Sequence, residues 1–170
     1  MVVTLDPKLG EIVLLSLRVS VSSVALAGVF ALPVGAAVAV AAFPGKRGVV
    51  TTLNALLGLP AVVVGLAVYL LLSRSGPLGA FGILFTPSAM VVAQAILVFP
   101  LLAALTRRFV ADAWGDSREQ LISLGADAWT SAFALLVDVR YTLVTIVLAG
   151  FGRAIAEVGA VMIVGGNIDG

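Results

Sequence analysis

The sequence predicts an all-α protein, a polytopic bundle of about four membrane-spanning helices with a short helix–glycine–helix segment outside the bilayer. Three observations support this fold class. First, 61% of the 170 residues are hydrophobic and only 11% are charged, whereas soluble domains carry about 25% charged residues. Second, long uncharged runs recur along the chain, and about 20 helical residues cross a hydrocarbon core. Third, one polar stretch between the last two long runs contains a glycine, Gly125.

Four apolar segments are long enough to cross a bilayer. We place these spans at residues 12–42, 49–73, 83–106 and 141–164. The third starts after the sequence SGPLGAFG, because clusters of glycine and proline interrupt helices. Four prolines fall within the spans, namely Pro33, Pro60, Pro87 and Pro100. Each removes a helical hydrogen bond and so predicts a kink or partial break, although proline is also simply more frequent in membrane helices than in soluble ones.

Basic residues near the span ends favour one orientation, because cytoplasmic loops carry an excess of lysine and arginine. Six basic residues lie in the two loops that follow the first and third spans: Lys46, Arg47, Arg107, Arg108, Arg118 and Arg140. Three lie on the other side: Lys8, Arg18 and Arg74. This distribution predicts a multi-pass protein of the cell (inner) membrane, with the amino terminus outside and residues 107–140 in the cytoplasm.

The composition also excludes several classes of function. The chain has no cysteine and no histidine, which excludes thiolate metal sites, cysteine nucleophiles and Ser-His-Asp catalysis. A phosphate-binding loop needs Gly-Lys followed by Ser or Thr, but Gly45-Lys46 is followed by Arg47. The basic residues are scattered rather than clustered along the sequence, which argues against nucleic acid. We therefore expect no catalytic site, no metal and no cofactor, and any pump would take its energy from another subunit.

The segment after the third span predicts two short helices joined by a bend. Ser117 and Gln120 have the spacing of a capping box, so a helix is expected to begin there. Gly125 then interrupts it, since glycine is unfavourable inside helices and permits sharp turns. Asp127 can cap a second helix that contains Trp129. The alternative is a surface loop that lies among the lipid headgroups.

The fourth span contains two charges, Arg153 and Glu157. They are four residues apart, so they share a helix face and can pair. Facing lipid at the bilayer centre, each would cost about 2.5–3.5 kcal/mol. We therefore expect both to face the bundle interior, a dimer seam or a water-filled path. They are either part of a translocation path or gate, or a structural clasp between helices.

Two stretches resemble a known family. The cytoplasmic EQLISLGADAW (residues 119–129) and the intramembrane GRAIAEVGA (residues 152–160) are similar to signatures of type-1 ABC importer permeases. The closing VMIVGGNI (residues 161–168) looks most like the tungstate-type permeases, with molybdate and sulfate permeases as close relatives. Gln120 and Leu121 depart from the family's two alanines. The resemblance implies one transmembrane domain over residues 9–170, incomplete at its C-terminus, because such permeases cross the membrane once more.

The resemblance also implies a function and a set of site residues. The protein would be the permease of an ATP-driven oxyanion importer, for tungstate first and for molybdate or sulfate as alternatives. Its partners would be a separate ABC ATPase subunit, an extracytoplasmic oxyanion-binding protein and a second copy of the chain. The ATPase contact would be formed by Glu119, Leu124, Gly125, Ala126, Asp127 and Trp129, and the path or gate by Arg153, Glu157 and Gly159.

Two other functions compete with this interpretation. The first is a fragment of a secondary transporter driven by an ion gradient, which would predict further intramembrane carboxylates. Residues 48–106 contain none. The second is a membrane scaffold that transports nothing, in which Arg153 and Glu157 act only as a clasp.

Overall fold

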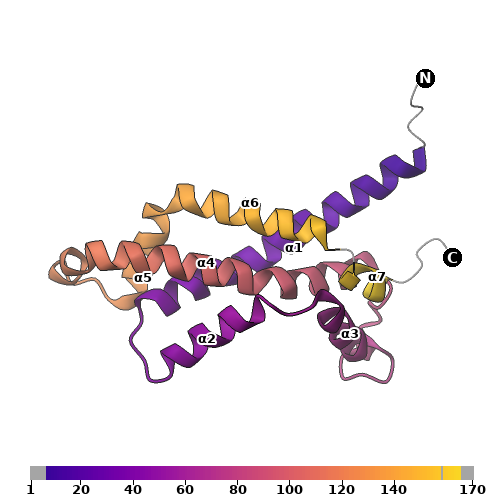
Figure 1. The fold of residues 1–170 in the computed structure, drawn as a ribbon, viewed down its shortest axis with the longest axis horizontal. Coiled ribbons are helices and arrows are strands. Elements are labelled where there is room, and N and C mark those ends of the chain that lie inside the picture. Colours follow the sequence, from indigo (N-terminus) through magenta and orange to yellow (C-terminus); the bar gives the residue numbers. More distant parts are fainter. Residues whose placement is uncertain (1–6, 158, 166–170) are drawn as a thin grey trace.

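The computed structural model describes residues 7–157 and 159–165, and every regular element within these ranges is helical. This confirms the all-α fold class. The elements are α1 Pro7–Val40, α2 Lys46–Leu56, α3 Ala61–Leu72, η1 Gly79–Phe81, α4 Pro87–Ser123, α5 Ala128–Asp138, α6 Arg140–Ala156 and α7 Gly159–Gly165 (Figure 1). Two helices, α1 and α4, are long and apolar enough to cross a membrane, or up to four spans exist if each bent helix pair counts as one.

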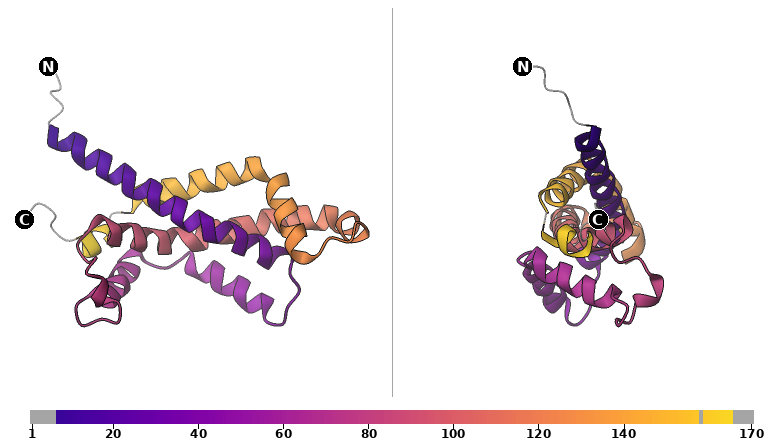
Figure 2. Two further views of the ribbon diagram at one scale, coloured as in Figure 1. Left: turned by 180° about the vertical axis from the view of Figure 1, so that it is seen from behind. Right: turned by 90° about the vertical axis from the view of Figure 1, so that its right-hand side faces the viewer.

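The bundle is built around the crossing of α1 and α4. Helix α6 lies along one side of this pair, and α2 and α3 lie on the other (Figures 1 and 2). Helix α5 is at one end of the molecule, and α3 and α7 are at the opposite end. The crossing needs a glycine on α1, because a Cβ at Gly35 would lie 2.6 Å from the carbonyl oxygen of Ala103. Small residues allow such close approach of membrane helices.

The interior and the outer surface of the bundle are both apolar. Val98 and Leu102 of α4 pack with Ile146 of α6 in the central core, and all three are almost fully buried. Large apolar side chains also cover the outside, including Val29 on α1 and Leu148 on α6, which are both more than half exposed. A surface of this kind is suited to contact with lipid rather than water.

The predicted second span is two helices rather than one. Residues 57–60 separate α2 from α3, and the two helix axes differ by 102°. Pro60 is extended, with ψ 131°, and immediately precedes α3. Pro87 likewise begins α4, whereas Pro33 and Pro100 lie inside continuous helices. Of the four prolines, Pro60 is therefore the one that lies at a break within a predicted span.

The predicted start of a separate helix at Ser117 is wrong. Helix α4 continues past residue 106, where the predicted third span ends, and runs without interruption to Ser123. Tertiary packing explains the continuity. Val110 is fully buried, and Trp114 and Leu121 pack against the cluster formed with α1 and α5. The apolar stripe of α4 thus extends about 22 Å beyond residue 106, to Leu121, at about 1.5 Å per residue.

The predicted fourth span is also interrupted. Helix α6 ends at Ala156, Glu157 has the extended backbone torsion ψ 102°, and α7 begins at Gly159. At its other end α6 follows α5 after a single residue, with the two axes 78° apart. Glu157 therefore follows the helix that carries Arg153 instead of belonging to it, which corrects the expectation that both residues share a helix face.

Candidate functional site

The turn between α4 and α5 is a glycine-dependent helix cap. Gly125 has φ +74°, a left-handed conformation that glycine adopts without strain. Its N–H donates to the carbonyl of Ile122 at 2.9 Å, and the N–H of Ala126 donates to the carbonyl of Leu121 at 3.0 Å. These two bonds form a Schellman motif, which satisfies carbonyls that the end of a helix leaves unpaired. The predicted bend at Gly125 is confirmed.

Asp127 begins the next helix as its N-cap. A carboxylate oxygen of Asp127 accepts a hydrogen bond from the backbone N–H of Thr130 at 2.8 Å, which confirms the predicted cap. The hydrogen bonds from Thr130 hold the pKa of Asp127 below its ordinary value. The carboxylate is therefore charged at neutral pH beside the N-terminus of α5, where the helix dipole favours negative charge.

Large apolar side chains project from this turn. Leu124 is 82% exposed, and Trp129 and Phe133 are each 69% exposed. Glu119 is exposed on the last turns of α4, and Ala126 is half-buried. The six residues predicted to contact an ATPase are therefore gathered at one end of the bundle (Figure 1). We call residues 119–129 the coupling segment.

The predicted charge pair of the fourth span does form. Arg153 Nε lies 2.9 Å from Glu157 Oε1, and the side chains are 39% and 14% exposed. The Nε–H makes no hydrogen bond within the described residues, so the contact is an ion pair without a directed hydrogen bond. Gly159 faces a different neighbour, since a Cβ there would lie 3.2 Å from Val62 Cγ2 of α3. Val158 and residues 166–168 of the tungstate-like ending lie outside the described residues.

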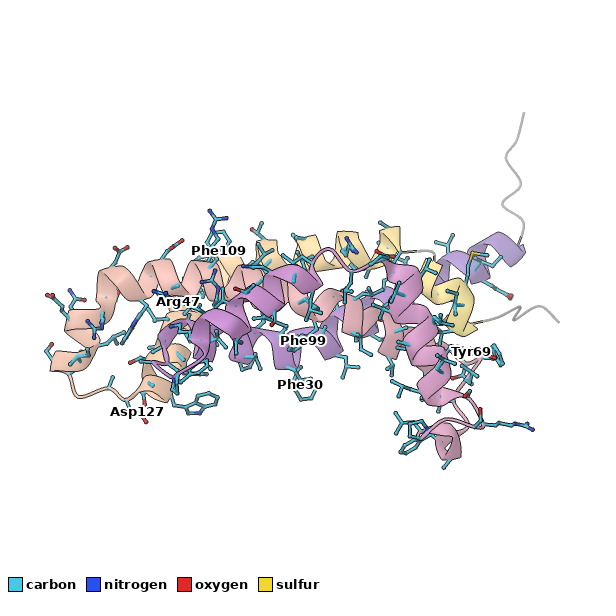
Figure 3. All side chains as sticks on the ribbon, turned by 60° about the horizontal axis from the view of Figure 1, so that its bottom comes forward. Phe30, Arg47, Tyr69, Phe99, Phe109 and Asp127 are labelled. Atoms are coloured by element: carbon cyan, nitrogen blue, oxygen red, sulfur yellow. The ribbon has the colours of Figure 1, made fainter. Side chains whose placement is uncertain are left out.

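The structure does not bring the two predicted sites together. The coupling segment lies at the α5 end of the bundle, whereas the ion pair lies where α6 ends, toward α7 (Figure 1). Figure 3 shows Asp127 far from Tyr69 of α3, which belongs to the end that contains α7. Any coupling between the two sites must therefore pass along the long helices that connect the two ends, α1, α4 and α6.

A buried polar link, which the sequence analysis missed, ties the end of α6 to the core. Gln94 of α4 is 4% exposed. Its Nε2 donates to the carbonyl of Ala154 at 3.1 Å, and its Oε1 accepts from Ser23 Oγ of α1 at 3.1 Å. A signal was available, because Gln94 is an amide inside an uncharged apolar run and such residues hydrogen-bond across membrane helices. Gln94 thus fixes the helix end next to the charge pair.

The chain is similar over most of its length to curated permeases, although no protein-family model matches it. It is 44% identical over 160 residues to the probable anion ABC transporter permease protein of Haloferax volcanii, covering 94% of this chain and 69% of that protein. It is 39% identical over 170 residues to the tungstate uptake system permease protein TupB of Peptoclostridium acidaminophilum, covering 100% and 75%. It is 30% identical over 172 residues to the sulfate transport system permease protein CysW of Synechococcus elongatus, covering 97% and 60%.

Proposed function

Since this chain belongs to the anion ABC transporter permeases, we propose that it is the membrane-spanning subunit of an ATP-driven oxyanion importer. Tungstate is the proposed substrate, because two of the similar permeases are named for tungstate uptake. Sulfate is the alternative supported by the similar sulfate permeases, and molybdate is a close chemical relative of tungstate. The proposed complex contains a second copy of the permease, ATPase subunits and an extracytoplasmic oxyanion-binding protein.

The coupling segment carries this proposal. Exposed aromatic and aliphatic side chains that cluster outside the membrane are typical of protein–protein contacts. Leu124 lies at a turn whose shape is fixed by two backbone hydrogen bonds and one cap, and Trp129 and Phe133 are exposed on the helix that follows it. A rigid apolar projection is what an ATPase subunit needs in order to transmit its movement to the bundle. The chain contains no phosphate-binding loop of its own.

Copurification of the ATPase with the tagged, full-length permease tests the contact. Leu124→Ala and Trp129→Ala should each release the ATPase, because both side chains are exposed and their removal leaves the core intact. Phe81→Ala is the matched control, since Phe81 is 70% exposed but lies on η1 at the opposite end. Retention of the ATPase by both test variants would contradict the assignment.

A second pair of variants tests the shape of the turn. Gly125→Val places a β-branched residue at φ +74° and should disrupt coupling, whereas Gly125→Asn should preserve it because asparagine tolerates this conformation. A Cβ at this position would meet no atom within 4 Å, so the difference between the variants reports backbone conformation and not a steric clash. Equal ATPase retention by the two variants would show that the left-handed turn is unimportant for coupling.

The proposed orientation places the coupling segment in the cytoplasm and the amino terminus outside. The chain has no cysteine, so single cysteines introduced at exposed Ser123 and exposed Ser75 can be labelled individually. An impermeant maleimide added to intact cells should modify the cysteine at 75 but not the one at 123. Labelling at 123 would reverse the orientation and remove the basis for ATPase contact.

A further inference from the structure

A large cleft opens beside the coupling segment and is lined by unpaired basic residues. It lies between the end of α1, the start of α2, the C-terminal part of α4 and the start of α5, and its volume is about 1190 Å³. Four cations line it: Lys46, Arg47, Arg107 and Arg118. None of the described residues that line the cleft is acidic. The four cations also form no ion pair within the part of the chain that the structure describes.

The fold gathers these cations from distant parts of the sequence and holds one of them, Lys46, by hydrogen bonds. Arg107, Trp114 and Arg118 are spaced by seven and four residues, so they lie on one face of α4. Lys46 Nζ donates to the carbonyls of Ala39 at 2.7 Å and Ala41 at 3.0 Å, at the C-terminus of α1. These bonds use two of the three ammonium protons, which leaves one for a ligand. Figure 3 shows Arg47 in the same part of the molecule as Asp127.

Two buried polar atoms of cleft residues lack a partner. Arg107 Nε and Ser131 Oγ are both buried and make no hydrogen bond within the described residues. Ser131 is fully buried. Because buried polar groups in native proteins are nearly always hydrogen-bonded, these two donors indicate a missing acceptor. An anionic acceptor would also neutralise the surrounding cations.

Most of the remaining lining is apolar. It includes Val40 at the end of α1, Phe43 in the loop that follows, Val50 of α2 and Ile122 of α4. Basic pockets between membrane helices bind phosphate headgroups, and a lipid acyl chain would cover an apolar wall of this kind. Arginine is suited to this role because its planar guanidinium can donate two parallel bonds to a phosphate.

We propose that this cleft binds a tetrahedral oxyanion group, held by Arg107, Lys46 and the hydroxyl of Ser131. The group is either the phosphate of an anionic membrane lipid or a free tetrahedral oxyanion. The proposal depends on the cleft alone and stands whether or not the coupling segment contacts an ATPase. Arg118, about 16 Å further along α4 at about 1.5 Å per residue, extends the basic wall toward the coupling segment.

Thermal unfolding of the intact permease in nanodiscs distinguishes the two sources. One arm raises the fraction of phosphatidylglycerol in phosphatidylcholine discs, and the other titrates inorganic phosphate into discs of phosphatidylcholine alone. A saturable rise in the unfolding temperature is expected in one arm, and that arm identifies the source. Absence of a saturable rise in both arms overturns the proposal.

Matched variants then locate the site. Arg107→Gln should weaken the response about tenfold or more, since a bond to a charged group is lost. Arg108→Gln removes the same charge from an exposed neighbour outside the cleft and should change the response less than about twofold. Equal losses in these two variants would mean nonspecific attraction and overturn the proposal. Lys46→Gln, which removes another of the assigned contacts, should also weaken the response, and it provides the same test if Arg107→Gln fails to fold.

Ser131→Ala provides a separate test. Without an anionic ligand, this variant should be at least as stable as the natural chain, because it removes a buried hydroxyl that has no partner. With the ligand, its stabilisation should be smaller than that of the natural chain. A variant that is destabilised equally with and without the ligand would show that Ser131 has only a packing role, which contradicts the assigned contact.

Discussion

Replacement of Gln94 by leucine should destabilise the bundle by only about 1 kcal/mol, although Gln94 bridges three helices. The substitution removes two hydrogen bonds, one from Ser23 Oγ and one to the Ala154 carbonyl. Each such bond contributes about 0.6 kcal/mol on average in membrane proteins. Both partners keep a second contact. Ser23 shares its single hydroxyl proton between Gln94 Oε1 and Val19 O, which is 2.6 Å from Oγ, so the proton can still be donated to Val19 O, and Ala154 O still accepts from Glu157 N at 3.3 Å. No buried group is therefore left without a partner.

Gln94→Glu should be far more harmful, by several kcal/mol at neutral pH, because an ionised carboxylate would be buried without a cation. The carboxylate also could not donate to the Ala154 carbonyl, which the amide does at 3.1 Å. Protonation restores a donor. The stability of this variant should therefore rise as the pH falls, whereas that of Gln94→Leu should not change.

Unfolding in mixed detergent micelles, followed by the fluorescence of Trp114 and Trp129, measures these differences. A double-mutant cycle with Ser23→Ala should give a coupling energy of about 0.6–1.7 kcal/mol. A coupling energy of zero, or a leucine variant less stable than the glutamate variant at neutral pH, would refute the assigned hydrogen bonds.

Three further predictions follow from local geometry. Gly65→Leu should destabilise the protein by about 1–3 kcal/mol, because a Cβ at Gly65 would lie 2.9 Å from Ala160 Cα. A Cβ at Gly152 would meet no atom within 4 Å, so Gly152→Ala should be neutral or stabilising. Thermal unfolding measures both variants. Because the pKa of Asp127 is lowered in the folded protein, its cap stabilises α5 fully above about pH 4, and this stabilisation is lost as the pH falls through the native pKa. Asp127→Asn should keep the cap but remove this pH dependence, which acid unfolding measures. If Arg153 and Glu157 form only a clasp, Arg153→Glu and Glu157→Arg should each abolish oxyanion uptake, and the double variant with both changes should restore it. If the pair is part of a gate, the double variant should fold but should not restore uptake.

The features that sequence predicted best are local ones. The bend at Gly125 and the cap at Asp127 depend on residues within a few positions of each other, so glycine and aspartate specify them wherever the helices lie. The family assignment likewise rested on short motifs, and the similarity to curated anion permeases confirms it. The contact between Arg153 and Glu157 was also predicted from their spacing, although Glu157 lies just past the end of α6 and not on it.

Features that depend on tertiary packing were not predictable in the same way. The capping-box spacing at Ser117 is real, but Val110, Trp114 and Leu121 pack against other helices and keep α4 continuous through it. The basic cleft was equally hidden, because Lys46 and Arg107 are 61 positions apart in the sequence and become neighbours of one cavity only in the fold. Counting charges per loop predicts the side of the membrane on which these residues lie, but it does not predict that they line one cleft.

The breaks in the second and fourth spans are best understood as one structural unit. An interrupted helix at membrane depth leaves backbone groups unpaired, so it must be shielded by protein. Helix α7 has only seven residues, too few to be stable alone. It packs on α3 through Gly65 and Ala160, and the Val164 carbonyl of α7 accepts the N–H of Phe85 at 3.1 Å. Helix α3 thus covers the break between α6 and α7, and the end of α6 that carries Arg153 should move together with α3.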